Sequence, residues 1–122
     1  MWTFQQTDGA IFDPAREPFT ISYAGAGAGK NNPLLEQVHD VGPLPRGRYT
    51  AGPAFHDPHL GADCMRLTPD PENEMFGRGD FLIHADSILH PGMASQGCIV
   101  VRDPAKRHLI AISEDREWEV TL

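Results

Sequence analysis

The segment 83–101, IHADSILHPGMASQGCIVV, concentrates residue types that can do nucleophilic chemistry. A cysteine attacks as its thiolate, so it needs a base that takes the thiol proton and amide donors for the oxyanion that forms. Cys98 follows Gly97, and a glycine at that place lets the backbone turn sharply against a reacting carbonyl. His84 lies upstream, where the apolar run FLIH ends and a buried strand is expected to emerge. The pattern therefore indicates a Cys98 nucleophile with His84 as its general base.

The same residues admit structural interpretations, and their spacing leaves these open. Free cysteine is among the most buried residue types, so Cys98 as a small core residue beside a hydrogen-bonded His84 is one alternative. A disulfide between Cys64 and Cys98 is another, although a lone bridge is uncommon in a chain made in the cytosol. A zinc site of His84, His90 and Cys98 is a third, but the H-x5-H-x7-C spacing matches no standard pattern of zinc ligands.

Two further motifs invite a functional interpretation. The histidines of HDPH, His56 and His59, lie in a loop rich in proline and glycine, where solvated side chains are expected. The stretch GAGAGK lacks the first glycine and the final Ser or Thr of a phosphate-binding loop, and its evenly spaced glycines do not fit a dinucleotide-binding turn. A structural loop is the default interpretation. The functional alternative is a substrate-facing loop in which Lys30 and Asn31 donate hydrogen bonds to a carboxylate.

Composition limits the fold and the partners. The chain of 122 residues has enough length for one domain, residues 1–122, and its 12 glycines and 11 prolines favour short elements joined by turns. Its net charge of -7 argues against nucleic acid as a partner. No apolar run reaches the length of a membrane span, and the first residues, MWTFQQTDGAIF, show no signal peptide. We expect a protein that is made in the cytoplasm and does not insert into membranes.

The hydropathy pattern predicts a mostly β, β-rich α+β domain with a mixed or antiparallel sheet and one short helix. Asp103 and Pro104 begin that helix as its N-cap and first residue. Strands are expected in MWTFQQ, AIF, EPFTISYAG, residues 48–51, DCMRLTP, FLIHAD, CIVV and EWEVTL.

Three sequence blocks resemble a known family. The core IHADSILHPGMASQGCI is similar to the His…Ser-x-Gly-Cys signature of L,D-transpeptidases. The blocks YAGAGAGKNNP and GPLPRGRY, in the same order, resemble the small L,D-transpeptidase-like effectors of bacterial type VI secretion. The resemblance covers most of the chain. It implies an L,D-transpeptidase-like fold, and it explains the missing signal peptide because such effectors are injected into target cells.

The resemblance also implies roles for individual residues. Cys98 is the nucleophile, His84 the general base, and the amides of Gly97 and Cys98 the oxyanion donors. Ser95 matches the motif serine and is expected to hydrogen-bond within the site or shape the turn. The expected partner that orients His84 is a backbone carbonyl or one of three side chains at the matching motif positions, namely Asp86, Ser87 and His90.

The sequence departs from the family pattern near both ends of the site. Ala85 replaces the glycine that usually follows the histidine, and Ala24 replaces a serine of the glycine-rich loop. Val100 and Val101 precede Arg102, whereas many L,D-transpeptidases carry an arginine or asparagine soon after the cysteine. The expected substrate contacts come from Lys30, Asn31, Ser87, His90 and Arg102.

The activity implied by the resemblance is modification of peptidoglycan. Cys98 would attack the third residue of a tetrapeptide stem and expel the terminal D-alanine, and the thioester would pass to water or to another D-amino acid. No metal or cofactor is required. The expected partners are the secretion apparatus and a cognate immunity protein, and the expected place of action is the periplasm of a target bacterium. The alternatives are another cysteine peptidase or amidase of the cell wall and a non-catalytic wall-binding or structural module.

Overall fold

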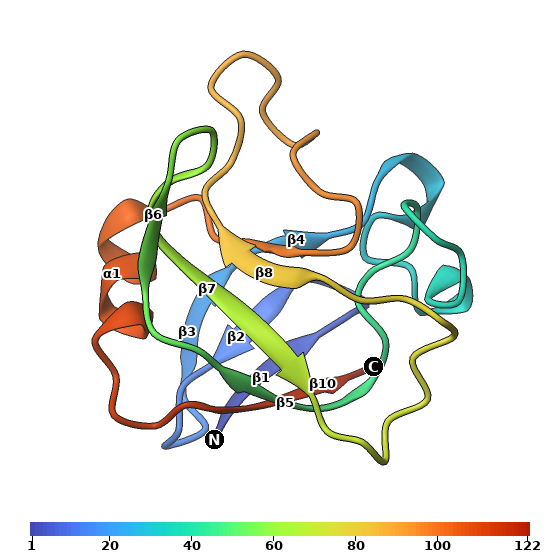
Figure 1. Cartoon of the computed structure of the whole chain (residues 1–122), viewed down its shortest axis with the longest axis horizontal. Coiled ribbons are helices and arrows are strands. Elements are labelled where there is room, and N and C mark those ends of the chain that lie inside the picture. The colour runs from blue at the N-terminus through green and yellow to red at the C-terminus, as the bar shows by residue number, and fades with distance from the viewer.

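The computed structural model describes all residues, 1–122, and its dominant feature is one 10-stranded mixed sheet (Figure 1). Two short 3₁₀ turns, Gly27–Gly29 and Pro33–Leu35, and one helix, α1 (Pro104–Ala111), complete it. The strands are β1 (Trp2–Gln5), β2 (Ala10–Phe12), β3 (Pro18–Ile21), β4 (Tyr23–Ala24), β5 (Gly47–Ala51), β6 (Phe55–Asp57), β7 (Gly61–Pro69), β8 (Phe81–His84), β9 (Ile99–Val100) and β10 (Glu117–Thr121). The mostly β prediction with one α-helix is confirmed.

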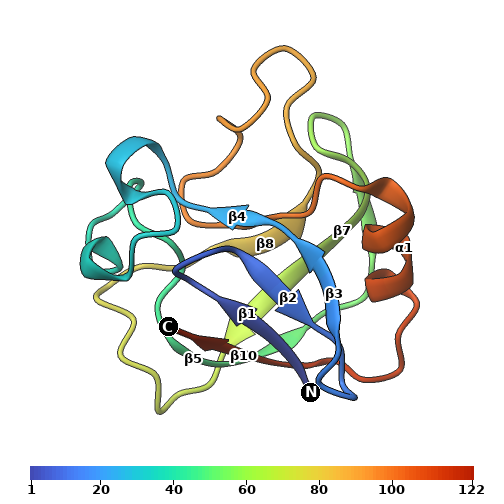
Figure 2. The same ribbon diagram turned by 180° about the vertical axis from the view of Figure 1, so that it is seen from behind.

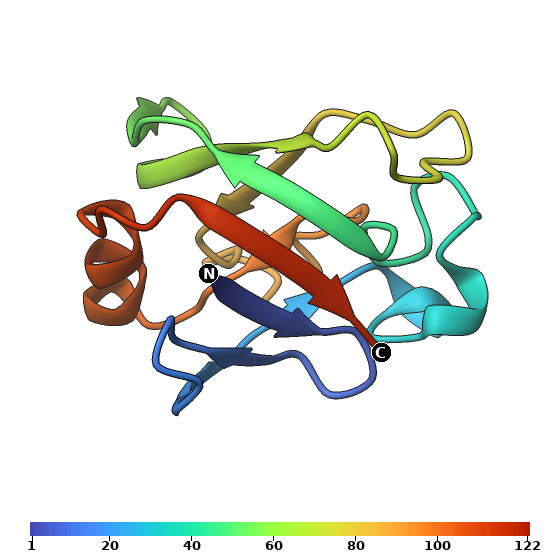
Figure 3. The same ribbon diagram turned by 90° about the horizontal axis from the view of Figure 1, so that it is seen from below.

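The sheet curls until it nearly closes into a barrel. The strand order is β3-β2-β1-β10-β5-β7-β8-β9-β4, with β6 paired only to β7. The pairs β1–β10 and β8–β9 are parallel and the others antiparallel, so the sheet is mixed as expected. Viewed from below, the strands surround a common interior and α1 lies at one end (Figure 3). Because β3 and β4 are consecutive in the chain yet lie at opposite ends of this order, the chain itself bridges the gap (Figure 2).

That bridge corrects the expectation of one continuous strand over EPFTISYAG. The chain leaves β3, which pairs with β2, and enters β4, which pairs with β9. Ser22 makes the break, because its N–H and its hydroxyl both donate to the carbonyl oxygen of Gly9, at 2.7 and 2.8 Å. The strand β6 was also not predicted. Its exposed residues, FHD, lack the alternation that marks a half-buried strand.

Helix α1 begins as predicted. The Asp103 carboxylate accepts hydrogen bonds from the backbone N–H groups of Ala105 and Lys106, and Pro104 occupies the first helical position. The helix packs against β7 and buries Ile110 and Arg107. It therefore covers one open end of the barrel and brings an arginine to the edge of the site described below.

Alternation along β8 and β9 separates core residues from site residues. Phe81, Ile83, Ile99 and Val101 belong to the hydrophobic core inside the barrel. Since successive side chains of a strand point to opposite faces, the intervening residues project to the other face; these are Leu82, His84, Cys98 and Val100. The loop between β8 and β9 arches over the end of these strands at the top of Figure 1. The two chemically important side chains therefore share the face outside the barrel core.

Candidate active site

Cys98 and His84 come from neighbouring parallel strands. Ile83 pairs with Ile99 and His84 with Val100, so Cys98 lies beside Leu82, one strand across and two residues along from His84. With strands about 4.8 Å apart and a rise of about 3.3 Å per residue, this diagonal separates the two Cα atoms by roughly 8 Å. Both side chains project from the same face. No hydrogen bond joins them in this structure.

The imidazole of His84 is oriented by the main chain. Its side chain is buried, with 3% of the residue exposed, and Nδ1 lies 2.7 Å from the carbonyl oxygen of Ala85. A carbonyl only accepts, so Nδ1 carries the proton and the neutral ring presents its lone pair at Nε2. Burial lowers the pKa of His84, and the hydrogen bond to Ala85 offsets this only in part. The histidine is therefore a neutral base at neutral pH.

The Cys98 sulfur rests against the main chain of β8. It accepts a hydrogen bond from the N–H of Leu82 at 3.3 Å and lies 4.0 Å from the carbonyl oxygen of Asp80. Burial raises the pKa of the thiol, although the N–H groups of Leu82 and of Cys98 itself favour the anion. Both shifts favour the uncharged forms, the thiol of Cys98 and the neutral imidazole of His84. A cysteine nucleophile in such surroundings needs a base that takes the thiol proton during attack.

Ser95 organises the turn that carries the cysteine. Its hydroxyl donates to the carbonyl of Cys98 at 2.7 Å and accepts from the N–H of Gly97 at 3.0 Å and of Gly25 at 2.9 Å. The turn-shaping role expected for Ser95 agrees with these contacts. The N–H of Gly97 is occupied by Ser95, whereas the N–H of Cys98 makes no hydrogen bond to another residue. Cys98, and not Gly97, therefore supplies the free amide of this turn.

A buried arginine lies under the same turn and was not found from the sequence. Arg78 is 8% exposed, and its guanidinium donates only to backbone carbonyls, including those of Gly42 at 2.9 Å and Gln96 at 3.2 Å. Gly97 packs directly on it: its φ is 135°, and a Cβ there would lie 2.7 Å from Nη2 of Arg78 and 2.6 Å from the ring of Phe81. Only glycine fits this position without displacing both neighbours. Arg78 has no carboxylate partner, so its positive charge favours a nearby anion.

Asp86 anchors the loop between β8 and β9 instead of orienting His84. Its carboxylate accepts from the hydroxyl of Tyr23 at 2.6 Å, from Nε of Arg102 at 3.1 Å and from the N–H groups of Ser87 and Gly92. Burial would raise the pKa of Asp86, but these hydrogen bonds outweigh it and lower the pKa. Burial and the bond to Asp86 raise the pKa of Tyr23 to about 12. The carboxylate thus ties both ends of the loop to β4 and to the residues after β9.

The five candidate substrate-contacting residues lie in different places. Lys30 and Arg102 both approach the ring of Tyr23, at 4.6 and 4.8 Å from its centroid, and gather near Asp86. Asn31 accepts a hydrogen bond from the N–H of Ala24 and so supports the glycine-rich loop.

The other two candidates, Ser87 and His90, are joined within the arching loop, where Ser87 accepts from the N–H of His90. Four of the five candidates therefore lie around or on this loop, and Asn31 has a structural contact instead.

The structure also bears on the alternative interpretations. Cys64 is a buried free thiol and Cys98 is free as well, so the two form no disulfide. No three His, Cys, Asp or Glu side chains are grouped as metal ligands. His56 lies exposed in β6, and His59 follows in the turn to β7.

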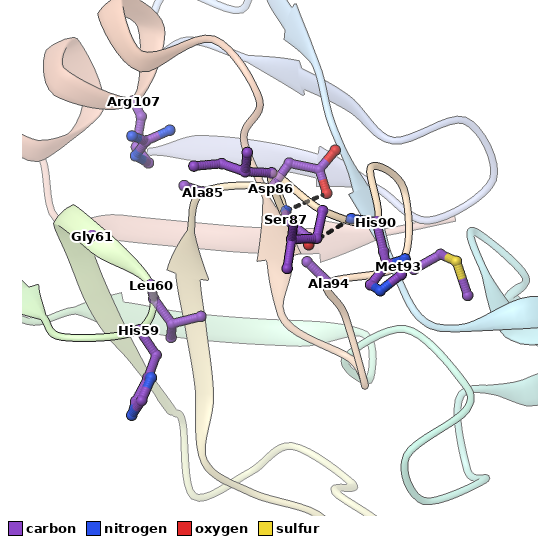
Figure 4. A pocket seen from close by; sticks show the side chains of 12 residues that line it. His59, Leu60, Gly61, Ala85, Asp86, Ser87, His90, Met93, Ala94 and Arg107 are labelled. Carbon is purple, nitrogen blue, oxygen red and sulfur yellow. Dashed lines mark hydrogen bonds between the residues drawn. The ribbon is translucent and has the colours of Figure 1, made fainter.

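A pocket of about 620 Å³ opens beside the residues that follow His84 in the chain, and the side chains that line it are drawn in Figure 4. Its walls are the arching loop, the β6–β7 turn and Arg107 of α1. Ala85 and Asp86, which follow His84 in the chain, line it, whereas neither His84 nor Cys98 does. Its lining residues are His59, Leu60, Gly61, Ala85, Asp86, Ser87, Ile88, Leu89, His90, Met93, Ala94 and Arg107.

Comparison with known proteins places the chain in a family. A family model described as the Tlde1 domain matches residues 20–120, which include the sheet strands β8 and β9, the arching loop and α1. The chain belongs to the Tlde1 family. Tlde1 domains are type VI secretion effectors, in agreement with the resemblance of the three sequence blocks. No curated protein matches the chain. No helix of this Tlde1 domain is both long and apolar enough to cross a bilayer.

Proposed function

We propose that this Tlde1 domain is a cysteine enzyme that removes or exchanges the terminal D-alanine of tetrapeptide stems in peptidoglycan. One observation carries the proposal: the outward alternation of β8 and β9 places Cys98 and His84 on one face, one strand and two residues apart. The fixed Nδ1–H of His84 supports it, because this tautomer presents a base. The effector family supports a cell-wall target.

The first half-reaction forms a thioester. Rotation about the Cα–Cβ bond of Cys98 turns the sulfur from Leu82 toward the imidazole. Nε2 of His84 takes the thiol proton while the sulfur attacks the carbonyl carbon of the third stem residue. The free N–H of Cys98 donates to the oxyanion, and the charge of Arg78 below the turn favours it electrostatically.

Collapse of this intermediate breaks the bond to D-alanine. His84, now protonated, gives its proton to the departing amine, and the third residue stays on Cys98 as an acyl group. Water then adds to the thioester and restores the thiol, which is L,D-carboxypeptidase action. If the amine of a free D-amino acid adds instead, a new peptide bond forms, which is exchange by transpeptidation. The chain supplies every group that these steps use, and no cofactor takes part.

The biological role follows from the product. Tetrapeptide stems are the donors of further cross-linking, so their conversion deprives a growing wall of substrate. We propose that the enzyme acts in the periplasm of a target bacterium after delivery by a type VI apparatus. A producing cell then needs an immunity protein that blocks the site.

The test is incubation of the domain with purified tetrapeptide muropeptides, with and without D-methionine, followed by mass analysis. We expect loss of D-alanine in the first case and a stem ending in D-methionine in the second. Cleavage at another bond would identify a different cysteine peptidase or amidase. Unchanged muropeptides, together with a Cys98→Ala variant that keeps full toxicity, would identify a non-catalytic module.

A further inference from the structure

Arg107 holds a buried positive charge without a carboxylate partner at the wall of the pocket in Figure 4. The residue is 7% exposed, and its Nη1 donates to the carbonyl of Val101 at 2.8 Å while Nε donates to that of Ala62 at 3.4 Å. Nη2 has no acceptor within the protein. A buried guanidinium with free N–H donors facing a pocket is suited to a carboxylate or another anion.

The guanidinium is linked to the backbone of His84 through Val101. Val101, whose carbonyl binds Arg107, donates its own N–H to the carbonyl of His84 at 2.9 Å. Burial is the main cause of the lowered pKa of His84, and the positive charge of Arg107 adds to it. Arg107 therefore lies on the side of Val101 and His84, whereas the sulfur of Cys98 rests on the side of Leu82 and Asp80.

The other charged groups of the pocket are already engaged or exposed. Asp86 forms an ion pair with Arg102 and accepts a hydrogen bond from the hydroxyl of Tyr23. His59 and His90 are exposed on the two loops that form the rim. An anion that enters the pocket is thus drawn to Arg107, the one buried cation among its lining residues.

We propose that Nη2 of Arg107 binds the C-terminal carboxylate of the residue that the enzyme expels, and this rests on the proposed function. In that reaction His84 protonates the amine of the leaving residue, so the leaving residue lies on the imidazole side. Its carboxylate and its amine are attached to the same Cα, which places the carboxylate close to the base. The pocket lined by Ala85, Asp86 and Arg107 is then the leaving-group subsite, and Arg107 restricts the enzyme to the free end of a stem.

The experiment compares the tetrapeptide acid with the same peptide ending in a carboxamide. Binding to the Cys98→Ala protein, measured by calorimetry, avoids turnover and uses the native arginine. We expect the carboxamide to bind at least about tenfold more weakly, because it loses the charge-assisted hydrogen bond. Equal affinities for the two peptides, or no binding of either, would overturn the assignment.

A third peptide separates the terminal carboxylate from the side-chain carboxylate of the third residue. Replacing the diamino acid at its third position by lysine removes the side-chain carboxylate and keeps the terminal one. We expect this peptide to bind the Cys98→Ala protein nearly as well as the parent. A large loss with lysine and none with the terminal carboxamide would assign Arg107 to the side chain and contradict the proposal.

Arginine variants test whether Arg107 is the cation that binds the terminal carboxylate. Arg107→Gln in the Cys98→Ala background should abolish the preference for the acid over the carboxamide, whereas the matched variant Arg46→Gln, on a remote loop, should keep it. Thermal melting shows whether Arg107→Gln has folded, and Arg107→Lys retains a charge if the glutamine does not fold. If the Cys98→Ala protein discriminates between the peptides but the wild type releases no D-alanine, the carboxylate site stands and the proposed reaction fails.

Discussion

The Nδ1 atom of His84 donates its proton to the carbonyl oxygen of Ala85, 2.7 Å away, and to no carboxylate. A backbone carbonyl fixes the tautomer as well as an acid would, but it carries no full charge to stabilise an imidazolium. The base is consequently held in place without being made strongly basic. Burial then lowers its pKa, and this combination determines how the enzyme should respond to pH.

Activity should survive mild acid. Because the pKa of His84 is lowered by burial, we expect the acid limb of kcat/KM for D-alanine release to have its midpoint below the ordinary histidine value of about 6.5. Protonation of Nε2 removes the base as pH falls through that midpoint. Rates across a pH series on the tetrapeptide measure it. A midpoint above 7 would mean that the base is stabilised in its charged form.

The free energy of unfolding should also depend on the protonation of His84. The unfolded chain binds a proton at His84 more readily than the folded one, so acidification favours unfolding. The free energy of unfolding should therefore fall as pH drops through about 6.5 toward the folded-state value. Denaturant melts of wild type and His84→Gln test this: the variant should lose stability less steeply over that window. Parallel curves would contradict the lowered pKa.

The reactivity of the Cys98 thiol toward an alkylating agent should depend on the charge of Arg78. In a Cys64→Ala background, alkylation by iodoacetamide reports Cys98 alone. We expect Arg78→Gln to slow alkylation at neutral pH and to move its pH midpoint upward, because the charge favours the thiolate. Arg78→Lys should restore part of the effect. Arg48→Gln, on β5, is the matched control, and a folded Arg78→Gln protein with an unshifted midpoint would refute the electrostatic role.

The ordered conformation of the arching loop, residues 85–98, should depend on the hydroxyl of Tyr23. Tyr23→Phe removes the bond to Asp86 and the acceptor for the N–H of Ala94. We expect a loss of about 1–2 kcal/mol in stability and faster proteolysis within residues 85–94. Tyr49→Phe removes a comparable bond, to the carbonyl of Pro45, far from the loop. If both variants speed cleavage of the loop equally, Tyr23 is not its anchor.

Ser95 should matter more than an ordinary surface serine. Ser95→Ala leaves the N–H groups of Gly25 and Gly97 without their acceptor, at a cost of about 1–3 kcal/mol for buried groups. The nucleophile turn should loosen, and kcat should fall with KM little changed. Ser113→Ala, at the far end of α1, provides the comparison. Wild-type kcat in a folded Ser95→Ala protein would show that the turn needs no such support.

Local patterns were sufficient to predict several parts of the fold. Apolar runs predicted β8 and β9, and the pair Asp103 and Pro104 predicted the start of α1, because each signal lies within a few residues. The break at Ser22 depends on Gly9, which is distant in sequence and adjacent only after folding. No local pattern encodes such a contact.

The candidate site residues also divide into those that a local motif predicts and those that depend on contacts distant in sequence. Cys98, His84 and Ser95 were identified from one contiguous motif, whereas Arg78 and Arg107 were missed. Both arginines bind backbone carbonyls from other segments. Every residue has such a carbonyl, so the residue types do not show which one will accept the hydrogen bond. An arginine in a polar loop or on a short helix is normally exposed. The amide of Gly97 was likewise expected to be an oxyanion donor, but it donates to the hydroxyl of Ser95 instead.

The most direct measurement is the mass of the intact protein, quenched in acid during turnover of a tetrapeptide. The proposed mechanism requires an acyl group, the stem without its last residue, bound to Cys98 as a thioester. Wild type and Cys64→Ala should gain that mass and lose it with hydroxylamine, and Cys98→Ala should never gain it. Release of D-alanine at the wild-type rate by Cys98→Ala would contradict the nucleophile on which the whole account depends.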